Sequence, residues 1–170
     1  MKYFDLNDGN RVPAIGFGTY KITEEKDMDL AVNTALEAGY TYFDTAKFYE
    51  NEDILGRYLK ESGKKRSDYQ IATKVWPNAY KADDTKRSLD ESIKDLGVDY
   101  LDVALLHWYG KNYKESLKVL KDYKDQGIIK SIGVCNFSTG QMTELLETGI
   151  TPVLDLSLIH ISEPTRQEAI

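Results

Sequence analysis

Short apolar stretches alternate along the chain with longer segments in which apolar residues recur at helical spacing. The short stretches are rich in β-branched and aromatic residues, which favours strands. They cover residues 13–18, 40–45, 69–75, 102–107, 131–135 and, as the start of a sixth strand, 151–155. The longer segments predict helices over residues 24–38, 52–59, 83–96, 113–126 and 139–147. Strands that alternate with helices of this length indicate βαβ units and a parallel sheet with covered faces.

Turn and capping residues mark where these elements begin. Thr23, followed by two glutamates, is expected to be the N-cap of the first helix. Residues 3–6 and 11–13 flank an Asp-Gly pair at positions 8–9, which is a hairpin signal. A β-hairpin is therefore expected before the first βαβ unit.

Two parallel architectures fit this alternation, an open doubly wound sheet and a TIM barrel. An open sheet that binds dinucleotides carries the pattern G-x-G-x-x-G after its first strand. Gly16 and Gly18 match the first two glycines, but Lys21 stands at the third position. The missing glycine favours the barrel.

Polar side chains interrupt the apolar strands close to their ends. Asp44 ends the second strand, Lys74 lies near the end of the third, and His107 ends the fourth. In a parallel barrel these ends meet at the face that carries active sites, so the three residues are expected to be neighbours. Tyr49 lies in the loop after Asp44, within reach of the same face. Taken singly, each has a structural alternative: an ion pair, a packed loop aromatic or a core histidine.

Composition narrows the class of protein. The chain has 170 residues, a mass of 19.4 kDa, 41% hydrophobic residues and a formal net charge of -6. The acidic balance argues against nucleic acid and anionic membranes as partners. The single cysteine, Cys135, excludes an internal disulfide. No apolar run is long enough to span a bilayer, and no secretion signal opens the chain, so a cytoplasmic location is expected.

Residues 156–170 break the alternation. They resemble one reading frame of a DNA adapter used in transposase-based sequencing libraries, with residues 167–169 as the sample index. We therefore expect one native domain over residues 1–155 and a non-native tail over residues 156–170. His160, which lies in that tail, is given no functional role.

Five short blocks resemble the aldo/keto reductase family. Residues 43–52 (FDTAKFYENE) are similar to its signature block, 72–76 (ATKVW) to its lysine block and 105–108 (LLHW) to its histidine block. Residues 132–137 (IGVCNF) and 16–20 (GFGTY) are similar to two further family stretches. The resemblance implies an α/β fold, the parallel (β/α)8 TIM barrel. The chain would supply roughly the first five βα units after the hairpin.

The resemblance also implies catalytic roles. Tyr49 would be the general acid that protonates a substrate carbonyl oxygen. Lys74 would favour the phenolate form of Tyr49, and Asp44 would hold Lys74 through a charge-assisted hydrogen bond. His107 would orient the carbonyl and complete an oxyanion site.

The implied cofactor is NADPH, with NADH as the alternative; no metal is implied. Its contacts would be Thr19, Asp44, Cys135 and Asn136. The implied substrate pocket contains Tyr20, Trp76 and Trp108. Two departures from the family pattern concern these sites: Cys135 replaces the usual serine, whose hydroxyl is a stronger donor than a thiol, and Tyr109 replaces the proline after the histidine-tryptophan pair.

The expected activity is therefore NAD(P)H-dependent reduction of small aldehydes or ketones to alcohols, with a small carbonyl compound as the partner. The alternative is an aldo/keto-reductase-like subunit that binds nucleotide as a regulator or partner and turns over negligibly. A non-redox TIM barrel would require the block matches to be chance. The full-length protein is expected to be a monomer. The 170-residue chain alone is expected to be inactive and not to form a stable monomer, because five βα units cannot close a barrel.

Overall fold

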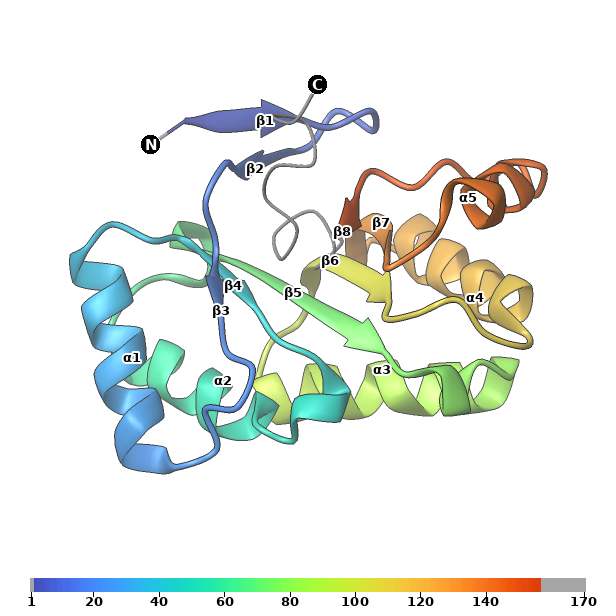
Figure 1. Cartoon of the computed structure of the whole chain (residues 1–170). Coiled ribbons are helices and arrows are strands. Elements are labelled where there is room, and N and C mark those ends of the chain that lie inside the picture. The colour runs from blue at the N-terminus through green and yellow to red at the C-terminus, as the bar shows by residue number, and fades with distance from the viewer. Residues whose placement is uncertain (1, 157–170) are drawn as a thin grey trace, which may run out of the picture.

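The computed structural model describes residues 2–156 and shows a curved sheet of six parallel strands (Figure 1). The strands are Phe17–Gly18 (β3), Tyr42–Asp44 (β4), Gln70–Val75 (β5), Leu101–Leu106 (β6), Ile129–Cys135 (β7) and Asp155–Leu156 (β8). Their order in the sheet follows their order in the chain. A doubly wound sheet would reverse its order at a switch point. The observed order is that of a half-barrel, which confirms the predicted TIM-barrel class.

One α-helix stands in each connection between consecutive strands and packs on the outer face of the curved sheet (Figure 1). The helices are Glu25–Glu37 (α1), Glu52–Glu61 (α2), Ala82–Leu96 (α3), Tyr113–Asp125 (α4) and Thr139–Leu146 (α5). Three short 3-10 helices lie in the loops: Lys47–Tyr49 (η1), Arg66–Asp68 (η2) and Pro77–Ala79 (η3). Within residues 2–156, no helix has the length and apolar character needed to cross a membrane.

The two faces of the sheet bury very different amounts of apolar surface. The main core lies between sheet and helices and includes Phe43, Ile71 and Val134. The inner face carries a small cluster centred on Val103 and Leu105. Because successive side chains of a strand point to opposite faces, every second residue belongs to this inner face. The inner face is where a barrel places its functional side chains.

Three boundaries differ from those predicted. The first parallel strand covers only β3, because Pro13 belongs to the hairpin strand Arg11–Pro13 (β2), which pairs with Tyr3–Asp5 (β1). The N-cap of α1 is Glu24 in place of Thr23, since the carbonyl of Glu24 accepts the first helical hydrogen bond, from Met28. The last strand, β8, begins at Asp155. The other strands and helices agree with prediction to within two residues at each end.

The expected tail lies outside the described residues except for Leu156, and so does His160. Leu156 pairs with Cys135 at the end of β7. The domain boundary at residue 155 stays a prediction.

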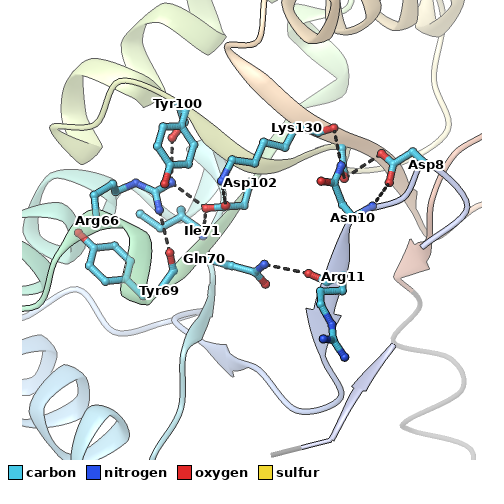
Figure 2. Close-up of polar contacts among 11 residues, drawn as sticks. Asp8, Asn10, Arg11, Arg66, Tyr69, Gln70, Ile71, Tyr100, Asp102 and Lys130 are labelled. Atoms are coloured by element: carbon cyan, nitrogen blue, oxygen red, sulfur yellow. Dashed lines mark hydrogen bonds and ion pairs between the residues drawn. The ribbon is translucent and has the colours of Figure 1, made fainter. Parts of the chain in front are cut away.

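The β1–β2 hairpin bonds to the first residues of β5 and β7, at the N-terminal end of the sheet (Figure 2). Asp8 pairs with Lys124 and accepts a hydrogen bond of 2.9 Å from the hydroxyl of Ser131. The Asn10 side chain donates to the carbonyl of Lys130 at 3.1 Å. A cavity of about 220 Å³ remains between the hairpin and the first residues of β5, β6 and β7. The hairpin therefore leaves the opposite edge of the sheet, where the strands end, for the functional site.

Asp102 is the centre of a charged cluster at the same N-terminal end (Figure 2). Its carboxylate is only 5% exposed. One oxygen accepts from Arg66 at 2.7 Å and from the backbone N–H of Ile71 at 3.0 Å, and the other accepts from Lys130 at 2.9 Å. The aromatic ring of Tyr100 lies 4.0 Å from both cationic groups. One buried acid thus ties β5, β6 and β7 together through their first residues.

Replacing Asp102 by alanine is expected to lower the free energy of unfolding of the full-length protein by about 3–5 kcal/mol, because it leaves the partly buried guanidinium of Arg66 without its carboxylate. Urea denaturation measures the change. Asp125→Ala is the matched control, since the exposed Asp125–Lys121 pair should contribute less than about 1 kcal/mol. Equal effects of the two substitutions would contradict the assigned role of Asp102.

Candidate active site

The polar residues predicted at the strand ends come together at the carboxyl edge of the sheet. Asp44 is the last residue of β4, Lys74 is the penultimate residue of β5, and His107 follows β6 directly. Asp44 and Lys74 have the same strand parity as Tyr42 and Ala72, which belong to the inner cluster. Alternation along the strands therefore directs both side chains to the inner face.

The ammonium of Lys74 links three groups of this site. Its side chain is 1% exposed. The Nζ atom donates to Asp44 Oδ1 at 2.5 Å, to the carbonyl of Thr45 at 2.8 Å and to the Tyr49 hydroxyl at 3.3 Å. An ammonium has three donors, so each finds an acceptor. This complete pairing makes the buried charge tolerable.

Asp44 uses only one of its two carboxylate oxygens on Lys74. Its Oδ2 is buried and has no hydrogen-bond partner among residues 2–156. Burial raises the pKa of the Asp44 carboxyl, and the charge of Lys74 acts in the opposite direction. Oδ2 is therefore an acceptor that the described residues leave available.

Tyr49 reaches the site from the end of η1. Glu50 follows with a positive φ of 53°, which ends the turn and directs the chain into α2. Burial raises the pKa of the Tyr49 phenol, while Lys74 lowers it less strongly. The lowering by Lys74 has the expected sign, but the net shift is upward. Tyr49 is therefore protonated at neutral pH, as a proton donor must be.

His107 is an uncharged imidazole at neutral pH. Burial, assisted by the charge of Lys74, lowers its pKa to about 4. Its Nδ1 is buried without a hydrogen-bond partner among the residues that the structure describes. Its ring stands nearly perpendicular to those of Tyr49 and Trp76, with centroid distances of 5.6 Å and 4.9 Å.

Aromatic side chains surround Tyr49 and His107. The ring of Tyr20 lies 4.9 Å from that of Tyr49, and Trp76 contacts His107. Phe48 stacks on Trp76 at 3.9 Å and is half exposed. The structure thus brings two of the three predicted pocket residues into contact with the site. Trp108 is 43% exposed and makes no ring contact with another residue of the described part of the chain, so its role in the pocket stays a prediction.

The remaining predicted cofactor residues lie near the same edge. Thr19 is fully buried, and both its N–H and its hydroxyl donate to the carbonyl of Asp44, at 3.0 and 3.1 Å. The Sγ of Cys135 accepts from Asn136 Nδ2 at 3.1 Å. Burial raises the pKa of the Cys135 thiol to about 12, so it is protonated at neutral pH. Asn136 also donates to the carbonyl of His107 at 3.3 Å.

Two site residues received no role from sequence reasoning. Phe48 and Asn51 both lie in the signature block, and their side chains belong to the site. Phe48 could have been found from its place beside Tyr49 in the strand-end loop. No cluster of three or more His, Cys, Asp or Glu residues within residues 2–156 could hold a metal ion.

Comparison with known sequences identifies relatives across most of the chain. The model of the aldo/keto reductase family matches residues 14–162. An aldo-keto reductase of Mycolicibacterium smegmatis is 40% identical over 166 residues, covering 95% of this chain and 60% of that protein. Methylglyoxal reductase DkgA of Salmonella typhimurium is 39% identical over 169 residues, covering 95% and 59%. The chain thus spans about six tenths of the length of these curated relatives.

Solved structures give the same result. An aldo/keto reductase of Brucella melitensis superposes with a TM-score of 0.87 at 38% identity, covering 92% of this chain and 62% of that one. A Bombyx mori aldo-keto reductase, solved in complex with NADP, has a TM-score of 0.86 at 31% identity, covering 92% and 57%. Because the family model spans most of the sequence and the half-barrel superposes on these structures, this chain belongs to the aldo/keto reductase family.

Proposed function

We propose that the full-length protein reduces small aldehydes or ketones to alcohols with NADPH. The observation that carries the proposal is the buried ammonium of Lys74, which contacts both Asp44 and Tyr49 beside the neutral His107. The names of relatives such as methylglyoxal reductase favour small carbonyl compounds, and 2-oxoaldehydes in particular, as substrates.

The four side chains have complementary parts in this reaction. The Tyr49 hydroxyl gives its proton to the carbonyl oxygen of the substrate, and Lys74 stabilises the phenolate that remains. Asp44 holds the ammonium in place through its Oδ1. His107 carries one N–H and donates it to the carbonyl oxygen without adding a charge to the site.

A nicotinamide cofactor fits the residues present. When bound, it supplies the hydride that reduces the carbonyl carbon. Asp44 Oδ2 would accept from a cofactor hydroxyl, which removes the cost of a buried acceptor without a partner. Cys135 and Asn136 would hold the nicotinamide end of the cofactor. Thr19 would contact the cofactor near the end of β4. The choice of NADPH over NADH is supported by the Bombyx mori relative solved with NADP.

The primary test is the loss of NADPH absorbance when the purified full-length protein is mixed with a panel of carbonyl compounds that includes methylglyoxal. We expect turnover with at least one small aldehyde or ketone. Tight NADPH binding without turnover on any of them would support instead a nucleotide-binding regulatory or partner subunit.

Replacing Tyr49 by phenylalanine is expected to lower kcat about a hundredfold to ten-thousandfold, because only the proton donor is lost while the ring stays. Stopped-flow assays measure kcat, and fluorescence titration should show nearly unchanged NADPH affinity. Retention of most of the wild-type turnover would refute the assignment of Tyr49.

His107 should stay neutral over the range in which an ordinary histidine titrates. Its folded pKa of about 4 lies below the ordinary value of 6.5, so between these values the unfolded chain binds more protons than the folded one. The contribution of neutral His107 to the free energy of unfolding is therefore present above pH 6.5 and is lost as the pH falls toward 4. We expect wild-type protein to lose more unfolding free energy between pH 7 and pH 5 than His107→Gln, measured by urea denaturation. The same loss in both proteins would contradict the lowered pKa.

Replacing Cys135 by serine is expected to tighten NADPH binding or leave it unchanged, with turnover retained. The reason is that a hydroxyl donates a stronger hydrogen bond than a thiol from the same position. Fluorescence titration of the variant beside the wild type measures the affinity. A large loss of affinity would show that the thiol fills an apolar space and does not contact the cofactor.

A further inference from the structure

Asn51 stands at the N-cap of α2 but does not cap the helix. Asparagine is favoured at this position because its side chain can accept from the first N–H groups of the helix. Here its side chain makes no such bond. Asn51 is instead fully buried, and all its side-chain hydrogen bonds are directed into the loops that follow β3 and β4.

The amide of Asn51 joins these two loops directly. Its Nδ2 donates to the carbonyls of Thr19 and Ile22 in the loop after β3, at 2.9 Å each. Its Oδ1 accepts from the hydroxyl of Thr45, the first residue after β4, at 2.9 Å. Only an amide offers two donors and an acceptor at this length. An aspartate would place a carboxylate against two carbonyl oxygens.

Both ends of this cross-link contact catalytic side chains or the residues beside them. The carbonyl of Thr45 is one of the three acceptors of the Lys74 ammonium, and Thr19 donates twice to the carbonyl of Asp44. Tyr20, next to Thr19, contacts the ring of Tyr49. One buried amide therefore joins the loop that bonds to Asp44 and contacts Tyr49 to the residue whose carbonyl accepts from Lys74.

We propose that Asn51 is a positioning residue for the reduction, acting through Thr45 on the Lys74–Tyr49 pair. The inference rests on the proposed function. Without the amide, the Thr45 side chain loses its link to the loop after β3, which loosens the carbonyl that helps to hold Lys74 beside Tyr49. Misplacement of this kind lowers the rate even when every catalytic side chain is present. The same misplacement leaves Lys74 less able to lower the pKa of Tyr49.

The test compares Asn51→Ala with wild type in the full-length protein. We expect kcat to fall at least about tenfold, while the substrate KM changes by less than about threefold, because the aromatic contacts remain. The alkaline limb of the kcat profile should move to higher pH, since Tyr49 then loses its proton less readily. Hydrogen exchange should rise at the amides of residues 19–22 and 45–49.

Asn10→Ala is the matched control. Asn10 also joins chain segments through its amide, but at the N-terminal end, where it bonds to Lys130 and Ser131. It should change stability without moving the pH profile or kcat. An Asn51→Ala enzyme that is folded, with wild-type kcat and pH profile, would overturn the inference. So would Asn10→Ala producing the same kinetic changes.

A second pair of variants decides the case if Asn51→Ala does not fold. Thr45→Val removes only the hydroxyl bonded to Asn51 and should lower kcat with the same alkaline shift, whereas Thr45→Ser should restore most of the loss. Wild-type kinetics in Thr45→Val would overturn the inference. Tyr49→Phe, assayed alongside, separates the two proposals: if it is as active as wild type, or wild type reduces no carbonyl compound, the proposed function fails and this inference falls with it.

Discussion

The buried ammonium of Lys74 is the constraint on which the rest of the site depends. A charge with 1% exposure is stable in a protein only if its donors are all paired. Lys74 meets this demand with the carboxylate that ends β4, the carbonyl of the next residue and the phenol at the end of η1. The strand end, the loop and η1 must therefore all keep their positions for the charge to stay buried.

Residues that stabilise the fold and residues of the candidate site lie at opposite ends of the strands. At the N-terminal end, Asp102 and the hairpin residues form ion pairs and hydrogen bonds across β5, β6 and β7 (Figure 2). At the carboxyl end, Asp44 Oδ2 and His107 Nδ1 lack partners among the described residues. Buried polar atoms left without partners cost stability. At the strand ends, the two predicted catalytic residues thus carry acceptor or donor atoms that a ligand could satisfy.

Much of this arrangement was predictable from the sequence, because it follows from periodicity. Apolar runs bounded by turn residues located most strands and helices, and strand ends that carry Asp44, Lys74 and His107 predicted their meeting at one edge. Some predicted boundaries were wrong because a residue type favoured one position and the backbone adopted another. Thr23 is a good capping residue, but the backbone of Glu24 begins α1. Pro13 continues an apolar run in the sequence, yet its pairing with Tyr3 places it in the hairpin.

The pKa shifts and the buried hydrogen bonds were harder to predict from the sequence. They depend on how deeply a group is buried and on partners that are distant in sequence. The family resemblance implies attraction between the Lys74 ammonium and the Tyr49 phenolate, but only the packed structure shows that burial outweighs this attraction and raises the Tyr49 pKa. Asn51 illustrates the same limit. An asparagine before a helix is explained locally as a cap, and that explanation gives no reason to look further. Only the three-dimensional structure shows that its amide bonds to residues 6, 29 and 32 positions away in place of the helix it precedes. A buried cap residue that does not cap is therefore a useful signal of a positioning role, since the helix forgoes a bond that the residue type could readily supply.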